Sequence, residues 1–128
     1  MKSIKLVLLL VAGLYLSGCT STPIVELNNE PIPTNSAQSI EQAIIQGCKA
    51  KGWTPIVASS NTIDAYITVR SHKAHVQITY DDKFYNINYV SSTNLDYDNG
   101  KIHRNYNKWI YKLSASIQQQ LGTRAQGY

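Results

Sequence analysis

The sequence predicts an α+β fold, a two-layer sandwich in which an antiparallel meander of three to four strands carries an N-terminal and a C-terminal helix on one face. Two observations predict it. Between residues 53 and 90, apolar and polar side chains alternate in short runs separated by turns, which is typical of antiparallel strands with one buried and one hydrated face. On both sides of this region, apolar residues recur at intervals of three and four, which indicates amphipathic helices. Both helices can bury their apolar stripes by covering the same face of the sheet.

The first helix is predicted to begin within residues 36–39. Ser39 and Gln42 have the spacing of a capping box, in which the serine side chain accepts a hydrogen bond from the backbone three residues later. Gly52 is a natural C-terminal stop. The apolar face of the helix carries Ile40, Ile44 and Cys48. We therefore expect the Cys48 thiol to be buried as a small hydrophobic group, and the alternative is a reactive thiol or an intermolecular disulfide.

Four short runs between the two helices have the pattern of strands. The first covers residues 53–58, and Pro55 within it suits the edge of a sheet because proline has no N–H to donate to a neighbouring strand. The others cover residues 62–70, 74–80 and 84–90, with turns between them. Their polar positions predict an outward face of the sheet that water reaches.

The last helix is predicted from about Ile102 to Leu121. Its apolar positions repeat close to the helical period and comprise Ile102, Tyr106, Trp109, Ile110, Leu113, Ile117 and Leu121. A basic row lies on another side of the same helix, which is typical of a solvated helix face, and it consists of Arg104, Lys108 and Lys112.

The N-terminal residues have the features of a bacterial lipoprotein signal peptide. Lys2 and Lys5 precede an apolar stretch that is too short to span a bilayer comfortably. Leu16-Ser17-Gly18-Cys19 then matches the lipobox, in which a signal peptidase cuts before a cysteine that already carries a diacylglyceryl group. We therefore expect a signal peptide over residues 1–18 and a lipidated Cys19. The alternative is an ordinary secretory peptide in which Cys19 lies near the cleavage site by chance.

The remaining chain divides into three segments. Residues 19–37 contain three of the four prolines and many Ser, Thr and Asn, so we expect the lipidated cysteine and a flexible tether there. Residues 38–121 are expected to form a single α+β domain, and residues 122–128 a C-terminal tail. The alternative for the tether is an extended strand that lies on the domain through Ile24, Val25, Leu27 and Ile32.

The expected lipid anchor predicts a location and one partner. Acyl chains on Cys19 would hold the protein to a membrane. The residue after this cysteine is Thr20 and not the aspartate that is associated with retention in an inner membrane. We therefore expect the cell envelope and, in a host with two membranes, the outer membrane with the domain facing the periplasm. The net charge of +4 includes Lys2 and Lys5, which cleavage removes, so the sequence predicts no nucleic-acid partner.

The sequence carries no motif of the common catalytic classes. It has no Gly-x-Ser-x-Gly elbow, no P-loop and no dinucleotide-binding fingerprint, so we expect no enzyme and no cofactor. Residues 94–100 are similar to the start of a calcium loop, but Asn99 stands in place of its glycine and Asn105 in place of its acidic twelfth ligand. We expect no metal, and the alternative site would draw on His72, His75 and His103 with Asp96 or Asp98.

The densest run of polar and aromatic residues, residues 91–110, contains the first candidate site. Turn chemistry accounts for residues 98–100, and helical periodicity assigns the apolar positions to the core. Six residues then remain unexplained, namely Ser91, Asn94, Asp96, Tyr97, His103 and Asn107. We expect them to form a packed polar corner that joins the last strand to the last helix by hydrogen bonds. The alternative is a polar cleft between residues 91–100 and the helix that binds a small ligand.

The hydrated face of the sheet is the second candidate site. Tyrosine and arginine are typical contact residues of interfaces. The candidate interaction face consists of Tyr66, Arg70, His75, Asn86 and Asn88. It predicts a non-enzymatic envelope lipoprotein that presents a small domain to an envelope protein or cell-wall partner. Alternatively, the partner adds a strand at a sheet edge, near Pro55 or along residues 84–90.

Two late motifs of this chain carry a resemblance to other proteins. They are Ile87-Asn88-Tyr89-Val90-Ser91-Ser92-Thr93-Asn94-Leu95-Asp96-Tyr97 and Ile102-His103-Arg104-Asn105-Tyr106-Asn107-Lys108-Trp109. With Gly52-Trp53 and the His75-Val76 strand, they resemble a family of small uncharacterised proteobacterial lipoproteins over about residues 40–118. The family pattern runs I-x-Y-x-x-S-x-N-L-x-Y and then I-H-x-x-Y-N-x-W. The resemblance implies an envelope lipoprotein without an established activity and assigns no catalytic role to any residue.

Overall fold

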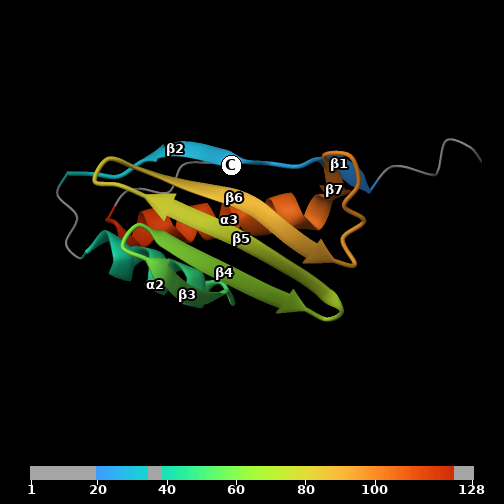
Figure 1. Cartoon of the computed structure of the whole chain (residues 1–128), viewed down its shortest axis with the longest axis horizontal. Coiled ribbons are helices and arrows are strands. Elements are labelled where there is room, and N and C mark those ends of the chain that lie inside the picture. The colour runs from blue at the N-terminus through green and yellow to red at the C-terminus, as the bar shows by residue number, and fades with distance from the viewer. Residues whose placement is uncertain (1–19, 35–38, 123–128) are drawn as a thin grey trace, which may run out of the picture.

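The computed structural model describes residues 20–34 and 39–122 (Figure 1). The expected signal peptide over residues 1–18, the expected lipidation of Cys19 and residues 123–128 of the expected tail lie outside them. Within the described ranges, no helix has the length and apolar character needed to cross a membrane.

The elements confirm the α+β class. They follow one another as β1 (Ser21–Pro23), β2 (Leu27–Pro31), α2 (Ile40–Ala50), β3 (Thr54–Ser59), β4 (Thr62–Val69), β5 (His72–Tyr80), β6 (Phe84–Thr93), β7 (Lys101–His103) and α3 (Arg104–Gln120). Ser39 caps α2 as expected, because its hydroxyl accepts a hydrogen bond from the Gln42 N–H at 3.2 Å. α3 begins two residues later than expected, at Arg104, because Ile102 and His103 belong to β7.

The main sheet has five antiparallel strands in the order β2-β6-β5-β4-β3. Strands β3 to β6 pair in chain order, and β2 pairs with the other side of β6 (Figure 1). The sheet is therefore wider than the three to four strands expected. β3 forms the opposite edge, in agreement with the edge position predicted from Pro55. A second sheet pairs β1 with β7.

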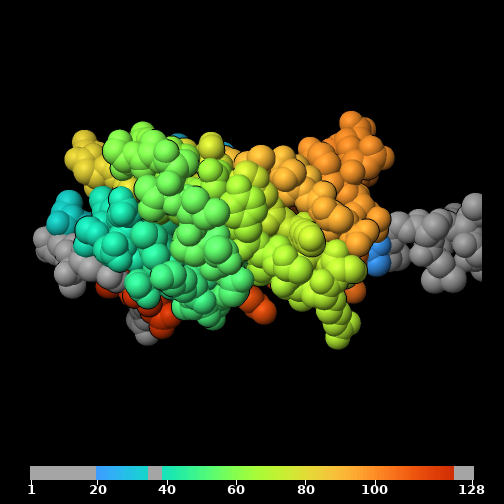
Figure 2. Space-filling view, turned by 60° about the horizontal axis from the view of Figure 1, so that its bottom comes forward, coloured from blue at the N-terminus to red at the C-terminus, as the bar shows by residue number. Residues whose placement is uncertain are grey.

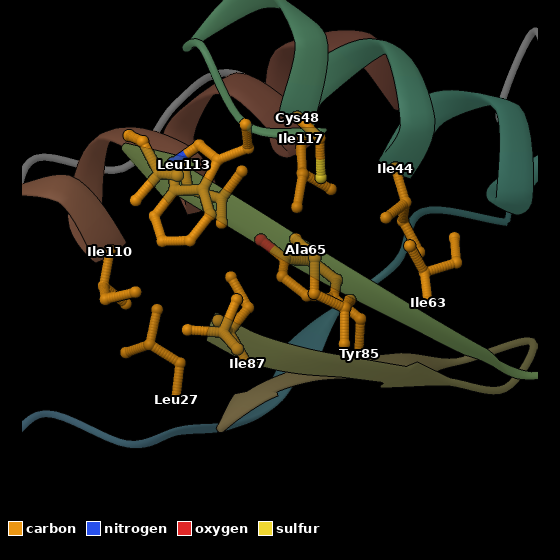
Figure 3. Packing of buried hydrophobic residues seen from close by; sticks show 14 of the residues in the cluster. Leu27, Ile44, Cys48, Ile63, Ala65, Tyr85, Ile87, Ile110, Leu113 and Ile117 are labelled. Atoms are coloured by element: carbon orange, nitrogen blue, oxygen red, sulfur yellow. The ribbon is translucent and has the colours of Figure 1, made fainter. Parts of the chain in front are cut away.

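The core lies between the helices and the main sheet. Figure 3 shows side chains of α2 and α3 pointing toward side chains of β4 and β6. The residues that meet there are all buried and include Ile44, Cys48, Ile63, Ala65, Tyr85, Ile87, Ile110, Leu113 and Ile117. A buried polar contact also joins the sheet to the helices. The Tyr85 hydroxyl on β6 lies 2.7 Å from the Ser114 hydroxyl on α3. The expected burial of Cys48 is confirmed.

The segment expected to be a flexible tether is part of the fold over residues 20–34. β2 pairs with β6, with Leu27 opposite Ile87 and Pro31 opposite Phe84. Leu27 and Ile32 are each only 7% exposed. Burying an aliphatic side chain of this size contributes about 1.5–3 kcal/mol, which a free tether would forgo. The tether prediction is therefore wrong for these residues, and the alternative of an extended strand on the domain is correct.

Candidate functional site

The outer face of the sheet is centred on a stacked pair of side chains. Tyr66 on β4 stands opposite His75 on β5, and their rings stack with centroids 4.2 Å apart and planes 17° apart. The Nε2 atom of His75 lies 2.9 Å from the Asp64 Oδ1 atom. The alternation of β4 and β5 places all three side chains on the face away from the buried Ile63, Ala65 and Val76. The stack is therefore held from one side by a carboxylate and is open on the other.

A hollow lies beside this pair where β6 bends. β6 carries a bulge opposite the step from His75 to Val76, so Ser91 comes to stand opposite His75. The hollow has a volume of about 220 Å³. Its lining is polar, aromatic and cationic together, and consists of Tyr66, Ile67, Thr68, Lys73, Ala74, His75, Ser91, Ser92 and Thr93. It offers hydroxyl groups, one ammonium group and an aromatic wall to a bound group.

The same face continues apolar onto β3. Ile56 stands opposite Asp64, two residues along from the Thr54–Tyr66 pair and therefore on the same face of the sheet. Ile56 is 53% exposed and Tyr66 is 41% exposed. Tyrosine is enriched in protein interfaces, and the exposed Ile56 beside it adds apolar surface. We refer to Ile56, Asp64, Tyr66 and His75 as the outer-face site.

Two members of the expected interaction face are occupied by the chain itself. The Asn86 Oδ1 atom accepts a hydrogen bond from the Asn29 N–H at 2.8 Å. The Asn88 Nδ2 atom donates to the Glu26 carboxylate at 2.7 Å. Both asparagines therefore fasten the N-terminal segment, and their place in a partner surface stays a prediction. β2 already pairs with residues 84–87, so this part of the edge is not open to an added strand. Arg70 is exposed in the turn between β4 and β5.

The six residues of the expected corner do not share one site. Asn94 binds the turn between β4 and β5, where its Nδ2 atom donates to the Ser71 carbonyl at 3.0 Å. Its own carbonyl oxygen lies 2.6 Å from the His72 Nδ1 atom. Ser91 faces the hollow described above. The expected hydrogen-bonded contact of Asn94 and Ser91 with His103 is therefore replaced by contacts with other strands.

Tyr97 packs over the end of β6. Its ring stacks on that of Tyr89 with centroids 4.4 Å apart, and the Tyr89 hydroxyl lies 2.8 Å from the Ser92 hydroxyl. Tyr97 is nevertheless 46% exposed. Asp96, beside it, is exposed and has a φ of 54°, which serves the turn. Both residues therefore shape the loop before β7.

His103 and Asn107 act on the start of α3 and on the N-terminal segment. The His103 Nδ1 atom accepts a hydrogen bond from the Asn105 N–H at 3.2 Å and so caps the helix. The Asn107 Oδ1 atom accepts from the Val25 N–H at 3.0 Å, and its Nδ2 atom donates to the Pro23 carbonyl at 2.9 Å. Because these side chains are used in this way, the geometry does not favour a ligand cleft between residues 91–100 and the helix.

The described part of the chain holds no group of three or more His, Cys, Asp or Glu side chains that could bind a metal ion. The three histidines instead contact different partners, the Asn94 carbonyl, the Asp64 carboxylate and the Asn105 N–H. Burial raises the pKa of the Cys48 thiol to about 12. The thiol is therefore protonated at neutral pH and is a poor nucleophile.

Tyr106 is a buried residue whose polar atom the sequence did not mark. Its ring meets the Tyr89 ring edge to face, with centroids 5.7 Å apart. Its hydroxyl is buried and has no hydrogen-bond partner among the residues described. Burial is the main cause that raises the pKa of the Tyr106 hydroxyl. Electrostatic repulsion from Glu26 and then from Tyr89 raises this pKa further. Helical periodicity predicted that the ring is buried. It cannot predict whether the hydroxyl finds a hydrogen-bond partner.

No family model, curated protein or solved structure matches this chain.

Proposed function

We propose that this chain is a non-enzymatic lipoprotein of the cell envelope that presents the outer-face site to a protein partner. The lipobox and the signal-peptide pattern support the anchor on Cys19 and the placement at the outer membrane, facing the periplasm. The two motifs around Tyr89 and His103 support membership in the family of small lipoproteins that they resemble. The cell wall is the other partner consistent with this location.

The observation that carries the proposal is the open Tyr66–His75 stack beside the hollow. Asp64 holds His75 through its Nε2 atom, which limits the freedom of the ring before any partner binds. A preordered aromatic surface loses less conformational entropy on binding than a mobile one. Exposed Ile56 and the partly apolar hollow add area that a partner would remove from water.

The arrangement of the two layers also supports this surface. We take the expected meander, with both helices on one face, to leave the opposite face of the sheet uncovered. Residues of α2 and α3 meet the buried side chains of β4 and β6 from one side (Figure 3). Tyr66, Asp64 and His75 alternate with those buried residues along the same strands.

Site-specific photo-crosslinking in cells tests the proposal. A photoreactive amino acid placed at Tyr66 in the full chain is expected to give one discrete adduct with an envelope protein. Lys83, exposed in the turn between β5 and β6, is the matched control position and is expected to give none.

Two results would contradict the proposal. One is the absence of any adduct above background from both Tyr66 and Ile56. The other is the same adduct from Lys83 as from Tyr66, since this would show unspecific proximity. A His75→Ala variant provides a further check, because loss of the stack is expected to weaken the adduct from Ile56.

A further inference from the structure

The charges of this protein are unevenly divided between the helices and the rest of the described chain. The helices and the cap of α2 carry a single acidic residue, Glu41, and five exposed basic residues, Lys49, Lys51, Arg104, Lys108 and Lys112. The remaining described residues carry four basic side chains, Arg70, Lys73, Lys83 and Lys101. They also carry seven acidic ones, Glu26, Glu30, Asp64, Asp81, Asp82, Asp96 and Asp98. The helical layer is therefore cationic, while the sheet and loops together are anionic.

A groove between this helical layer and β4 is bordered by two tryptophans. It has a volume of about 370 Å³ and is lined by Lys51, Trp53, Ile67, Val69, Trp109 and Lys112. Trp53 is almost fully buried, whereas Trp109 is half-buried and Val69 is 38% exposed. The chain contains two tryptophans, and both line this groove. Tryptophan and lysine together suit the boundary between lipid headgroups and acyl chains, where an indole ring is half in water and ammonium groups meet phosphates.

The start of the described chain is held at the first turn of α3. The Arg104 N–H donates to the Thr20 carbonyl at 2.9 Å, and Asn107 binds Pro23 and Val25. Thr20 directly follows Cys19, the residue that the proposed function lipidates. Figure 2 shows the first described residues, in blue, next to the orange loop before β7. An anchor on Cys19 would therefore bring the bilayer close to Arg104 without an intervening flexible segment.

We propose that the helical layer docks on an anionic phospholipid surface, with the groove lysines at the phosphates and Trp109 at the headgroup–acyl boundary. This inference rests on the proposed function for its anchor, and its own support is the charge division and the groove. A lipid anchor combined with a basic patch binds membranes more firmly than either alone. Docking in this orientation leaves the outer-face site turned away from the bilayer and toward the periplasm.

Tryptophan emission in vesicles tests the docking. The mature protein, as processed in the cell, is purified from membranes and reconstituted into vesicles. The vesicles consist of neutral phosphatidylcholine or of anionic phosphatidylglycerol, each with or without brominated acyl chains. Because both tryptophans line the groove, quenching by bromine reports its contact with lipid. We expect about two-fold quenching in the anionic vesicles and little in the neutral ones. Raising the salt from about 0.01 M to about 1 M shortens the Debye length from about 30 Å to about 3 Å and is expected to abolish the difference.

Matched charge variants locate the contact. Lys51→Gln with Lys112→Gln removes the two groove lysines and is expected to remove most of the quenching. Lys73→Gln with Lys83→Gln removes the same charge from exposed positions outside the helical layer and is expected to leave quenching unchanged. All four lysines are exposed, so neither double variant disturbs the core.

Each outcome decides between the two ideas. Quenching that is equal in neutral and anionic vesicles, or absent from both, overturns the docking. An equal loss of quenching in the two double variants would show that the groove is not where the protein contacts lipid. Flotation with neutral vesicles tests the anchor by itself, so a protein that floats only with anionic vesicles supports the docking while it counts against lipidation of Cys19.

Discussion

At the scale of single residues, two buried tyrosines of this protein differ in one hydrogen bond. The Tyr85 hydroxyl lies 2.7 Å from the Ser114 hydroxyl, whereas the Tyr106 hydroxyl has no partner among the residues that the structure describes. Both rings are fully buried. A buried hydroxyl without a partner costs about 1–3 kcal/mol, because it loses its hydrogen bonds with water and gains none.

Tyr106→Phe is therefore expected to raise the free energy of unfolding by about 1 kcal/mol. The matched substitution Tyr85→Phe removes a hydroxyl that has a partner and is expected to lower the free energy of unfolding by about 1 kcal/mol. Urea unfolding at neutral pH measures the two changes. Loss of stability in Tyr106→Phe similar to that in Tyr85→Phe would show that the Tyr106 hydroxyl is hydrogen-bonded in solution.

The sequence predicted buried residues better than it predicted polar partners. Periodicity placed Cys48, Tyr106 and Ile117 in the core, and the structure confirms all three. It also isolated Asn107 as a polar residue in need of an explanation. It did not find its partners, Pro23 and Val25, because these lie 84 and 82 residues away in the chain. A side-chain amide can bind any backbone segment that tertiary folding brings to it, so its partner leaves no local pattern.

Among the elements, α2 and α3 approach each other closely at Gly47. A Cβ atom added at Gly47 would lie 2.7 Å from the Ile117 Cγ1 atom and 2.8 Å from the Ile117 Cα atom. The Ser116 hydroxyl donates to the Gly47 carbonyl at 2.9 Å across the same contact. Gly47 therefore sets the distance between the two helices, a role that helix periodicity alone does not reveal.

Gly47→Ala is expected to lower the free energy of unfolding by about 1–3 kcal/mol, because the new methyl group meets backbone atoms of α3. This outcome has the opposite sign to alanine's intrinsic helix preference of about 1 kcal/mol over glycine. Gln46→Ala, one residue earlier and exposed, is the control and is expected to change stability by about 0.5 kcal/mol or less. A Gly47→Ala protein more stable than the parent in urea unfolding would mean that the helices separate without loss.

At the scale of the whole molecule, the N-terminal segment runs along the domain from one end to the other (Figure 1). β1 pairs with β7, Asn107 and Glu26 fasten the middle of the segment, and β2 extends the main sheet. The domain expected over residues 38–121 therefore needs residues 20–34 to complete its core and to cover the edge of β6.

A chain that begins at residue 34 is expected to lose about 4 kcal/mol of stability relative to one that begins at Thr20, because Leu27 and Ile32 leave the core. It is also expected to self-associate, since the edge of β6 is then unpaired. Urea unfolding and size-exclusion chromatography measure the two effects. Equal unfolding midpoints and equal elution volumes of the two chains would contradict this prediction. They would show that the segment is a tether and does not stabilise the domain.

Local sequence patterns predicted strands β3 to β6, both helices and the features expected of an anchored chain, but not β1, β2 or β7. Hydrophobic period, caps and turn residues act over a few positions, so they are readable without a structure. The tertiary structure was needed to show that β2 joins the main sheet, that Asn86 and Asn88 bind the N-terminal segment, and that both tryptophans border one groove. These contacts join residues far apart in the chain. They depend on how the helices and the sheet pack together. Even a proline-rich stretch forms a strand where the edge of a sheet offers hydrogen bonds and the core buries its apolar side chains.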